Sequence, residues 1–298
     1  MFLKKLLFML ALAGAALNIH AEPLRYFGQA PESYQSAVPY GNNPETGKYV
    51  ASDGANIYYE VYGQGEPIAV LHGDLVGSPA EMAQFVDVLR ANRQVILVNT
   101  RGHGKSQAGA DISYGQKARD LHAVLAALGV GKADLLGFSG GAYTALFFAA
   151  EYPEQTGRIV AIGAGAWKKR FRSFGSGDFA EVEKLDPAYW GEQQGGVRPE
   201  PDKTADWYRK SISYYNGLSL GKRFFRRISA PVLLLAGEKD QNAPLDTVLA
   251  AYRMLPNASL SIVAGAPHPV FLTNFDAVWG SVAPFLNAAV AAQTKESK

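Results

Sequence analysis

A single serine, Ser139, lies in a cluster of glycines that joins two apolar segments. Residues 137–141 read GFSGG, after an apolar run from Ala133 and before a segment in which small apolar residues recur with helical spacing. A sharp turn from a strand into a helix exposes the serine hydroxyl. The first N–H groups of the helix and its positive dipole end then face any negative charge formed there. This pattern predicts a nucleophilic serine beside an oxyanion site.

An acid and a histidine follow Ser139 in the chain, each just after an apolar segment typical of a buried strand. Asp240 follows the run of residues 231–236, and His268 follows the run of residues 260–263. A serine becomes a nucleophile when a histidine accepts its proton and a carboxylate orients the histidine. The chain order serine, acid, histidine therefore favours nucleophilic catalysis over a turn that merely contains a serine.

These three residues and their order resemble the α/β-hydrolase superfamily, whose nucleophile turn has the pattern G-x-S-x-G. The resemblance extends over nearly all of the chain after residue 47, except a central insertion. It implies that Ser139 attacks an acyl carbon, that His268 takes and returns the proton, and that Asp240 holds the imidazole. It implies neither a cofactor nor a metal.

A second segment, His72-Gly73-Asp74, resembles the oxyanion loop of the same superfamily. The resemblance assigns the two oxyanion donors to the backbone N–H groups of Asp74 and Gly140, and His72 is expected to be structural. Asp74 departs from the family, in which this residue is frequently apolar or neutral. A carboxylate that faces an oxyanion would oppose the reaction. We therefore expect the Asp74 side chain to point away or to be paired.

Two further motifs predict structure rather than chemistry. Residues 99–106 resemble a loop of the superfamily with the pattern D-x-R-G-x-G-x-S, with asparagine in place of the aspartate. That loop is usually structural, so Arg101 and His103 are expected to be scaffold residues. Residues 78–81 (SPAE) have the pattern of a capping box with proline at the first helical position, which predicts that a helix begins there.

The order of the apolar runs predicts an α/β protein. Segments that read as buried strands, around residues 67–71, 94–98, 133–136, 158–162, 231–236 and 260–263, are separated by helical patterns. This alternation favours a mostly parallel, doubly wound sheet with helices on both faces and an antiparallel hairpin at one edge. We assign residues 48–166 and 230–294 to this α/β-hydrolase core.

Residues 167–229 break the alternation and are predicted to form a helical cap inserted before the acid-bearing strand. Three of the four tryptophans, Trp167, Trp190 and Trp207, lie here among many tyrosines and phenylalanines. A cap covers the nucleophile and supplies much of the substrate pocket, so we assign Trp190 and Trp207 to substrate binding. Packing inside a small cap explains the aromatic residues equally well. The basic clusters at residues 168–170 and 226–227 are interpreted as solvated surfaces.

Residues 1–21 have the three regions of a signal peptide: Lys4 and Lys5, then an apolar run, then the small residue Ala21. We expect a periplasmic or secreted protein with no stable membrane insertion after cleavage. An uncleaved anchor is the alternative, although the apolar run is short for a membrane span. Residues 22–47 are rich in Pro, Gly, Asn and Gln and are predicted to be an N-terminal arm, either packed loosely on the core or serving as a tether.

Composition narrows the expected partners. The formal net charge is +2, and Lys4 and Lys5 account for it, so the chain from Glu22 onward is neutral and has no general attraction for nucleic acid. The chain has no cysteine, which excludes disulfides, metal thiolates and a cysteine nucleophile. The expected partner is a small acyl compound, and the sequence does not predict an oligomeric state.

The favoured activity is hydrolysis of a small or medium carboxylic ester through an acyl-enzyme. The same triad also serves C–C bond hydrolysis, lyase chemistry and cofactor-free peracid or haloperoxidase chemistry, and a non-catalytic ligand-binding protein of this fold is a further alternative. The loop after His72 lacks the glycines and proline of proline iminopeptidases, which disfavours a peptidase. A serine rather than an aspartate at the turn disfavours haloalkane dehalogenase and epoxide hydrolase activity.

Overall fold

A computed structural model of the chain describes residues 21–168, 175–191 and 196–288. The predicted signal peptide lies outside these residues except for Ala21, as do two members of the first basic cluster, Lys169 and Arg170. The described residues contain one sheet of eight strands. The strands are β1 (Lys48–Ser52), β2 (Ala55–Tyr62), β3 (Glu66–Leu71), β4 (Arg93–Val98), β5 (Ala133–Phe138), β6 (Thr156–Ile162), β7 (Val232–Gly237) and β8 (Ala258–Val263).

The sheet is mostly parallel, and its strand order is β1-β2-β4-β3-β5-β6-β7-β8. The strands β1 and β2 form an antiparallel hairpin at one edge, and β2 also pairs antiparallel with β4. All other neighbours are parallel and so need crossover connections, which helices supply. The predicted fold class is confirmed, including the hairpin at the edge.

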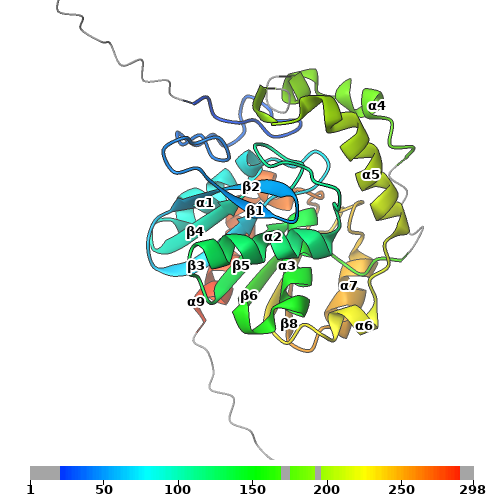
Figure 1. Ribbon diagram of the computed structural model, residues 1–298. Helices are drawn as coiled ribbons and strands as arrows, with labels where there is room; N and C mark the ends of the chain where they lie inside the picture. The colour runs from blue at the N-terminus through cyan, green and yellow to red at the C-terminus, as the bar shows by residue number, and fades with distance from the viewer. Residues whose placement is uncertain (1–20, 169–174, 192–195, 289–298) are drawn as a thin grey trace, which may run out of the picture.

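Helices cover both faces of the sheet (Figure 1). They are α1 (Ala83–Leu89), α2 (Tyr114–Ala127), α3 (Gly140–Glu151), α4 (Phe179–Glu183), α5 (Thr204–Gly217), α6 (Lys222–Phe225), α7 (Leu245–Met254), α8 (Val270–Thr273) and α9 (Phe275–Asn287). Side chains of α2, α3 and α7 bury one face, and side chains of α1, α8 and α9 bury the other. The core therefore has two apolar layers with the sheet between them.

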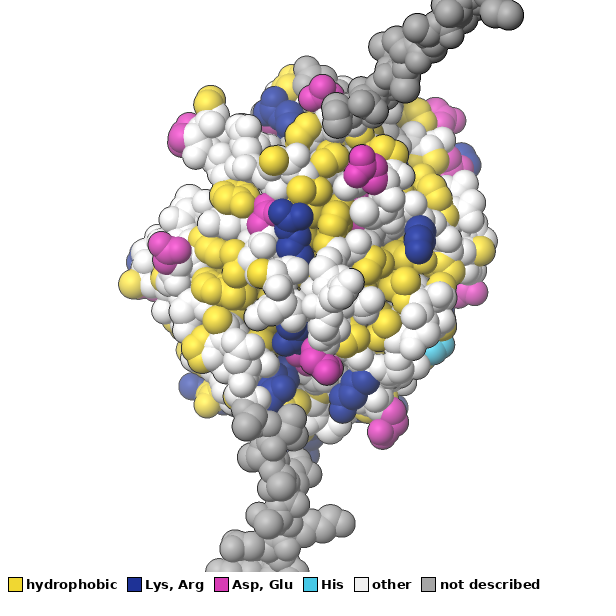
Figure 2. Space-filling model, turned by 90° about the vertical axis from the view of Figure 1, so that its left-hand side faces the viewer, with side chains coloured by type: hydrophobic (Ala, Val, Ile, Leu, Met, Phe, Trp, Pro, Cys, Tyr) yellow, Lys and Arg dark blue, Asp and Glu magenta, His cyan; other side chains and the backbone are white. Residues whose placement is uncertain are grey.

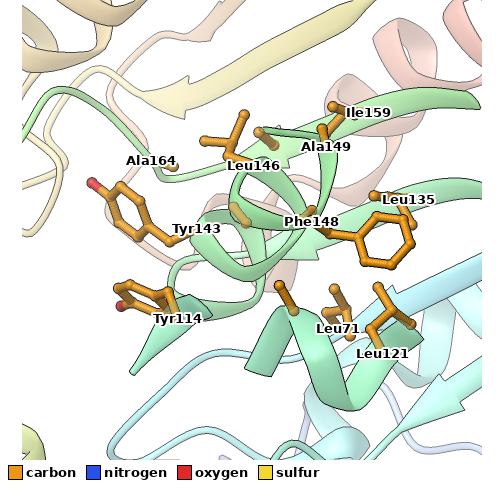
Figure 3. Close-up of a cluster of buried hydrophobic side chains, with 14 of the residues drawn as sticks. Leu71, Tyr114, Leu121, Leu135, Tyr143, Leu146, Phe148, Ala149, Ile159 and Ala164 are labelled. Atoms are coloured by element: carbon orange, nitrogen blue, oxygen red, sulfur yellow. The ribbon is translucent and has the colours of Figure 1, made fainter. Parts of the chain in front are cut away.

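Successive residues of a central strand enter opposite layers. Leu135 of β5 packs in the layer that contains α2 and α3, where it lies near Phe148 (Figure 3), and Leu136 packs in the other layer. Burial on both faces explains why the central strands are apolar at nearly every position. The loops after β3, β5, β7 and β8 leave the carboxyl ends of parallel strands, so they meet at one edge of the sheet, where α/β proteins bind ligands.

The segment between β6 and β7 contains α4, α5 and α6. Its base is closed by an isolated antiparallel bridge in which Trp167 and Leu220 exchange two backbone hydrogen bonds of 2.9 and 2.5 Å. Figure 1 shows α4 and α5 outside the layers formed by the sheet and by α2 and α3. Tyr208 and Tyr215 of α5 line the same cavity as Ser139. This segment therefore lies over the carboxyl ends of the strands.

The N-terminal arm is fastened to the core by a buried carboxylate. Glu60 of β2 accepts hydrogen bonds from the N–H groups of Gly41 and Asn43, both at 2.7 Å. It also accepts from the hydroxyls of Tyr58 and Tyr62, at 2.9 and 2.8 Å. Loose packing and a free tether are therefore wrong for residues 41–43. Because backbone N–H groups make these contacts, the side-chain pattern of the arm does not predict them.

One face of the molecule, shown in Figure 2, has Lys, Arg, Asp and Glu side chains interspersed among hydrophobic ones. In the part of the chain that the structure describes, no helix combines the length and the apolar character needed to cross a membrane.

Candidate active site

Ser139 occupies a strained turn between β5 and α3. Its backbone has φ of 50° and ψ of −114°, a conformation that costs a residue with a side chain on the order of 1–3 kcal/mol. A β-carbon on Gly137 would overlap the backbone of Gly141, and one on Gly141 would overlap the carbonyl oxygens of Leu71 and His72. Glycines on both sides of the serine thus allow α3 to approach β3 and β5 closely.

The structure brings Ser139, His268 and Asp240 together. Nε2 of His268 lies 2.9 Å from Oγ of Ser139. Nδ1 of the same ring lies 2.8 Å from Oδ2 of Asp240. In this arrangement Nδ1–H can donate to the carboxylate while Nε2 accepts the serine proton. The three residues named from the sequence therefore have the geometry of a proton relay.

Asp240 is buried, with 4% of its surface exposed. Its Oδ1 accepts hydrogen bonds from the N–H groups of Asn242 and Ala243 at 2.8 and 2.7 Å. Burial acts to raise the pKa of Asp240, but the hydrogen bonds from His268 and these two N–H groups outweigh it and leave the pKa below its ordinary value. The resulting negative charge can stabilise a protonated imidazole at His268.

The two predicted oxyanion donors lie close to each other beside Ser139. Gly140 is the first residue of α3, so its N–H has no acceptor within the helix. Asp74 follows β3, and its N–H donates no hydrogen bond to another described residue. A β-carbon on Gly140 would overlap the Asp74 carboxylate, which shows how closely the two residues pack. Neither N–H group is engaged in a hydrogen bond to another described residue.

The Asp74 carboxylate is paired, as the sequence led us to expect. Its Oδ1 contacts Nζ of Lys117 on α2, and the two side chains are 6% and 3% exposed. A buried carboxylate without a partner would be strongly destabilising. The pair thus explains how an acidic residue is tolerated in this loop.

His72, His103 and Arg101 occupy scaffold positions. Nδ1 of His72 lies 2.7 Å from the carbonyl oxygen of Gly73, and its Nε2 accepts from the N–H of Thr100 at 3.1 Å. Burial lowers the pKa of His72 to about 4 and lowers the pKa of His103 as well. Arg101 is fully buried and donates two hydrogen bonds of 2.6 Å to Asp120. These residues join the loops beneath the oxyanion site.

A cavity of about 210 Å³ borders Ser139 and His268. Several aromatic rings line it, among them Tyr114 of α2, Phe138 of β5 and Tyr143 of α3. The segment between β6 and β7 contributes Trp167, Tyr208 and Tyr215. An apolar cavity with a few polar groups at one end is typical of a site for a small organic ligand.

Trp190 and Trp207, which we assigned to substrate binding, do not line this cavity. The ring of Trp207 packs at 4.8 Å against His103, and the ring of Trp190 packs at 4.8 Å against Phe179. Both indoles are at most 4% exposed. The structure therefore gives both tryptophans a packing role. Other aromatic residues of the same segment, Tyr208 among them, face the cavity instead.

Two residues of the site were not identified from the sequence. Lys117 was overlooked, although it lies between Tyr114 and Leu121 on the buried face of α2, where a lysine is unusual and needs a partner. Glu81 was predicted only as part of a capping box. A 3-10 helix, Pro79–Met82, does begin there, and the Glu81 carboxyl group accepts a hydrogen bond from the Ser78 backbone, but Ser78 Oγ accepts from the N–H of Ala80 at 3.3 Å rather than from that of Glu81. Glu81 also lines the cavity.

The Glu81 carboxyl group contacts the oxyanion loop. It accepts a hydrogen bond from the N–H of Gly73 at 2.5 Å. Burial raises the pKa of Glu81 to about 8, against the lowering effect of hydrogen bonds from the Gly73 and Ser78 backbone. The group is therefore mostly protonated at neutral pH.

Among the described residues, no group of three or more His, Cys, Asp and Glu side chains is placed to hold a metal ion.

Comparisons with known proteins agree with the fold. The family model described as the alpha/beta hydrolase fold matches residues 66–194. The chain is 26% identical over 269 residues to a non-heme haloperoxidase of Rhodococcus erythropolis, and the match covers 80% of this chain and 98% of that protein. It is also 26% identical over 251 residues to a 2-hydroxymuconate semialdehyde hydrolase of Pseudomonas sp. (strain CF600), covering 76% of this chain and 89% of that protein.

Solved structures extend the likeness in fold. The crystal structure of a serine hydrolase involved in carbazole degradation has a TM-score of 0.67 to this chain at 20% sequence identity. The match covers 80% of this chain and 98% of that one. At this identity the likeness concerns the fold alone.

Proposed function

We propose that this protein, which belongs to the α/β-hydrolase superfamily, is a serine hydrolase that cleaves small or medium carboxylic esters through an acyl-enzyme. One observation carries the proposal: the hydrogen bonds from Ser139 to His268 and from His268 to Asp240, at 2.9 and 2.8 Å. Relatives that span most of the chain include a hydrolase and a haloperoxidase, which favours an enzyme over a ligand-binding protein.

The reaction begins when Oγ of Ser139 attacks the ester carbonyl carbon and its proton moves to Nε2 of His268. The carbonyl oxygen becomes an oxyanion, which the N–H groups of Asp74 and Gly140 bind. The C–O bond to the leaving group then breaks, and His268 gives its proton to the departing alcohol. Water then attacks the acyl-enzyme in the same way, with His268 taking its proton and returning it to Oγ of Ser139. The carboxylic acid is released and Ser139 is regenerated. Asp240 stabilises the imidazolium in both halves of the reaction.

The cavity supports a small substrate. Its volume of about 210 Å³ lies below the 300–1,000 Å³ that is common for pockets of drug-sized ligands. Aromatic rings from Tyr143, Trp167 and Tyr215 form part of the wall, beside polar groups at Asp74, Glu81 and Asn242. Such a wall suits a short acyl chain or a small ring rather than a charged group.

The test is a series of 4-nitrophenyl esters with acyl chains of two to twelve carbons. We expect the highest kcat/KM for the short members, and the Ser139→Ala variant should lose roughly 10⁶-fold in kcat without a change in unfolding temperature. Equal rates in the wild type and the Ser139→Ala variant, on every ester, would refute the proposal.

A second candidate function is hydrolysis of a C–C bond next to a carbonyl group. It is favoured by the match to a 2-hydroxymuconate semialdehyde hydrolase along 76% of this chain, and the same three residues could serve it. A vinylogous 1,5-diketone added to the ester series decides between the two. If its kcat/KM exceeds that of every ester, C–C hydrolysis replaces ester hydrolysis as the function. Bromination of a phenol dye by peroxide, acetate and bromide tests haloperoxidase chemistry in the same way.

A further inference from the structure

A carboxylate lies unusually close to the proposed oxyanion site. The side chain of Asp74 packs directly over Gly140, so closely that a β-carbon on Gly140 would overlap its Cβ, Cγ and Oδ2. The backbone N–H groups of these same two residues are the proposed oxyanion donors. A negative charge at this distance would repel the oxyanion that forms during the reaction and would raise the barrier to its formation.

Lys117 supplies the opposing charge. Its side chain is 3% exposed, and its Nζ contacts Oδ1 of Asp74 from α2. Burial, followed by the charge of Asp74, raises the pKa values of the neighbouring Tyr114 and Tyr215, so both phenols stay neutral. His72 is also neutral at neutral pH because burial lowers its pKa. Within the described residues, Lys117 is thus the cation that neutralises Asp74.

The position of this pair distinguishes it from a second buried ion pair and from a half-buried one. Arg101 and Asp120 join a loop to α2, and Arg93 and Asp134 join the amino ends of β4 and β5. Asp74 instead lines the cavity beside Ser139, and its main chain carries a proposed oxyanion donor. A change at Lys117 therefore acts on the reaction as well as on stability.

We infer that Lys117 is a positioning residue of the oxyanion site. Its ammonium group neutralises the Asp74 carboxylate and holds the loop after β3, so that the N–H groups of Asp74 and Gly140 face the reacting oxygen. This inference rests on the proposed function. It also explains why the departure of this loop from the family pattern is compatible with an oxyanion site.

The test is a pair of substitutions that separates charge from packing. Lys117→Met removes the cation with little loss of volume and leaves the Asp74 carboxyl group without its counter-charge, and kcat should fall about 10- to 100-fold with KM changed less than threefold. Adding Asp74→Asn removes the remaining charge, and kcat of the double variant should rise at least fivefold above that of Lys117→Met. A purely structural role predicts no such recovery, since the second change removes a further interaction.

Arg93→Met is the matched control, because it breaks the Arg93–Asp134 pair at the opposite end of the strands. It should lower the unfolding temperature and leave kcat unchanged. If Lys117→Met does not fold, Lys117→Gln with and without Asp74→Asn gives the same comparison. The inference is wrong if Lys117→Met keeps the wild-type kcat, or if the double variant is as slow as the single one.

The rate of labelling by a fluorophosphonate separates this inference from the proposed function. Labelling of the wild type that is lost in Ser139→Ala, together with equal labelling rates for the wild type and Lys117→Met, would overturn only the role of Lys117. A wild type that is not labelled would overturn the proposed function and this inference with it.

Discussion

Asp240 and Glu81 are two buried carboxyl groups near one cavity, and their surroundings favour opposite charge states at neutral pH. Asp240 accepts three hydrogen bonds, which outweigh its burial and lower its pKa. For Glu81, burial is the largest effect on the pKa and raises it to about 8. The first group is thus a carboxylate that can orient and stabilise His268. The second adds little negative charge beside the oxyanion site.

Replacing Asp240 by asparagine should lower kcat by about 10⁴-fold, because an amide does not hold the imidazole in the tautomer that accepts the serine proton. The matched control is Asp246→Asn, a substitution at an exposed acid in the first turn of α7. Steady-state kinetics on one ester checks both variants. Similar kcat values for the two variants would remove Asp240 from the relay.

Glu81 should make stability depend on pH. The pKa of Glu81 is higher in the folded protein than in the unfolded chain, so the folded protein binds the proton more tightly. Protonated Glu81 therefore contributes its full stabilisation below about pH 4.5, and this contribution is lost as pH rises through about 8. Glu81→Gln has no charge to bury and should escape this loss. Urea unfolding at pH 5 and pH 8.5 should therefore show a gain for the variant over the wild type that grows with pH. Parallel pH dependence in the two proteins would contradict the assignment.

At the scale of elements, the carboxyl ends of β3 and β5 and the start of α3 fix the site. Ser139 and the neighbouring glycines could be predicted because a strand, a tight turn and a helix are all encoded within about twenty consecutive residues. Asp240 and His268 likewise follow strands that read clearly as apolar runs. The contact between Lys117 and Asp74 could not be predicted, because it depends on how α2 is rotated against a loop 43 residues earlier in the chain.

The close approach of α3 to β3 makes a specific prediction about two helical glycines. Glycine to alanine within a helix normally stabilises a protein by roughly 0.5–1 kcal/mol, and Gly280→Ala in α9 should do so because its β-carbon meets open space. Gly141→Ala should instead destabilise by about 1–3 kcal/mol, because its β-carbon would overlap backbone oxygens of Leu71 and His72. Chemical unfolding measures both. Stabilisation by Gly141→Ala would contradict the packing described for the turn.

In the segment between β6 and β7, some aromatic residues pack against neighbouring side chains and others face the cavity. The sequence could not rank Trp190, Trp207 and Tyr208, since all three are aromatic residues of one segment and the direction of each side chain depends on how that segment packs on the core. Tyr208→Ala should change the ratio of kcat/KM between a short-chain and an aromatic ester by about 10- to 200-fold. Trp190→Ala should lower stability by about 3–5 kcal/mol and leave that ratio unchanged. Equal ratios in both variants would remove Tyr208 from the substrate site.

At the scale of the whole molecule, hydrogen bonds and packing contacts connect the arm, the core and the segment between β6 and β7. Glu60 fastens the arm at Gly41 and Asn43, and the bridge between Trp167 and Leu220 closes the base of the segment. These contacts involve main-chain groups or single side chains, so composition and periodicity do not reveal them. The mostly parallel sheet with a hairpin at one edge, by contrast, could be predicted from the alternation of strands and helices, although its strand order could not.

We propose that the protein is exported and that its signal peptide is removed after Ala21. The basis is Lys4 and Lys5, the apolar run and the small residue that follows it. Expression in a bacterium, followed by fractionation and intact-mass measurement, should give a periplasmic or secreted protein that begins at Glu22. A protein that retains residues 1–21 in the membrane fraction would instead show an uncleaved anchor.

The central claim is that Ser139 carries the acyl group during catalysis. The most direct measurement treats the protein with a fluorophosphonate and locates the adduct by peptide mass spectrometry. The account predicts one added phosphonyl group, on the peptide that contains Ser139, with labelling abolished by Ser139→Ala and slowed by Asp240→Asn. Unchanged labelling of the Ser139→Ala variant, or no adduct on a correctly folded wild type, would contradict it.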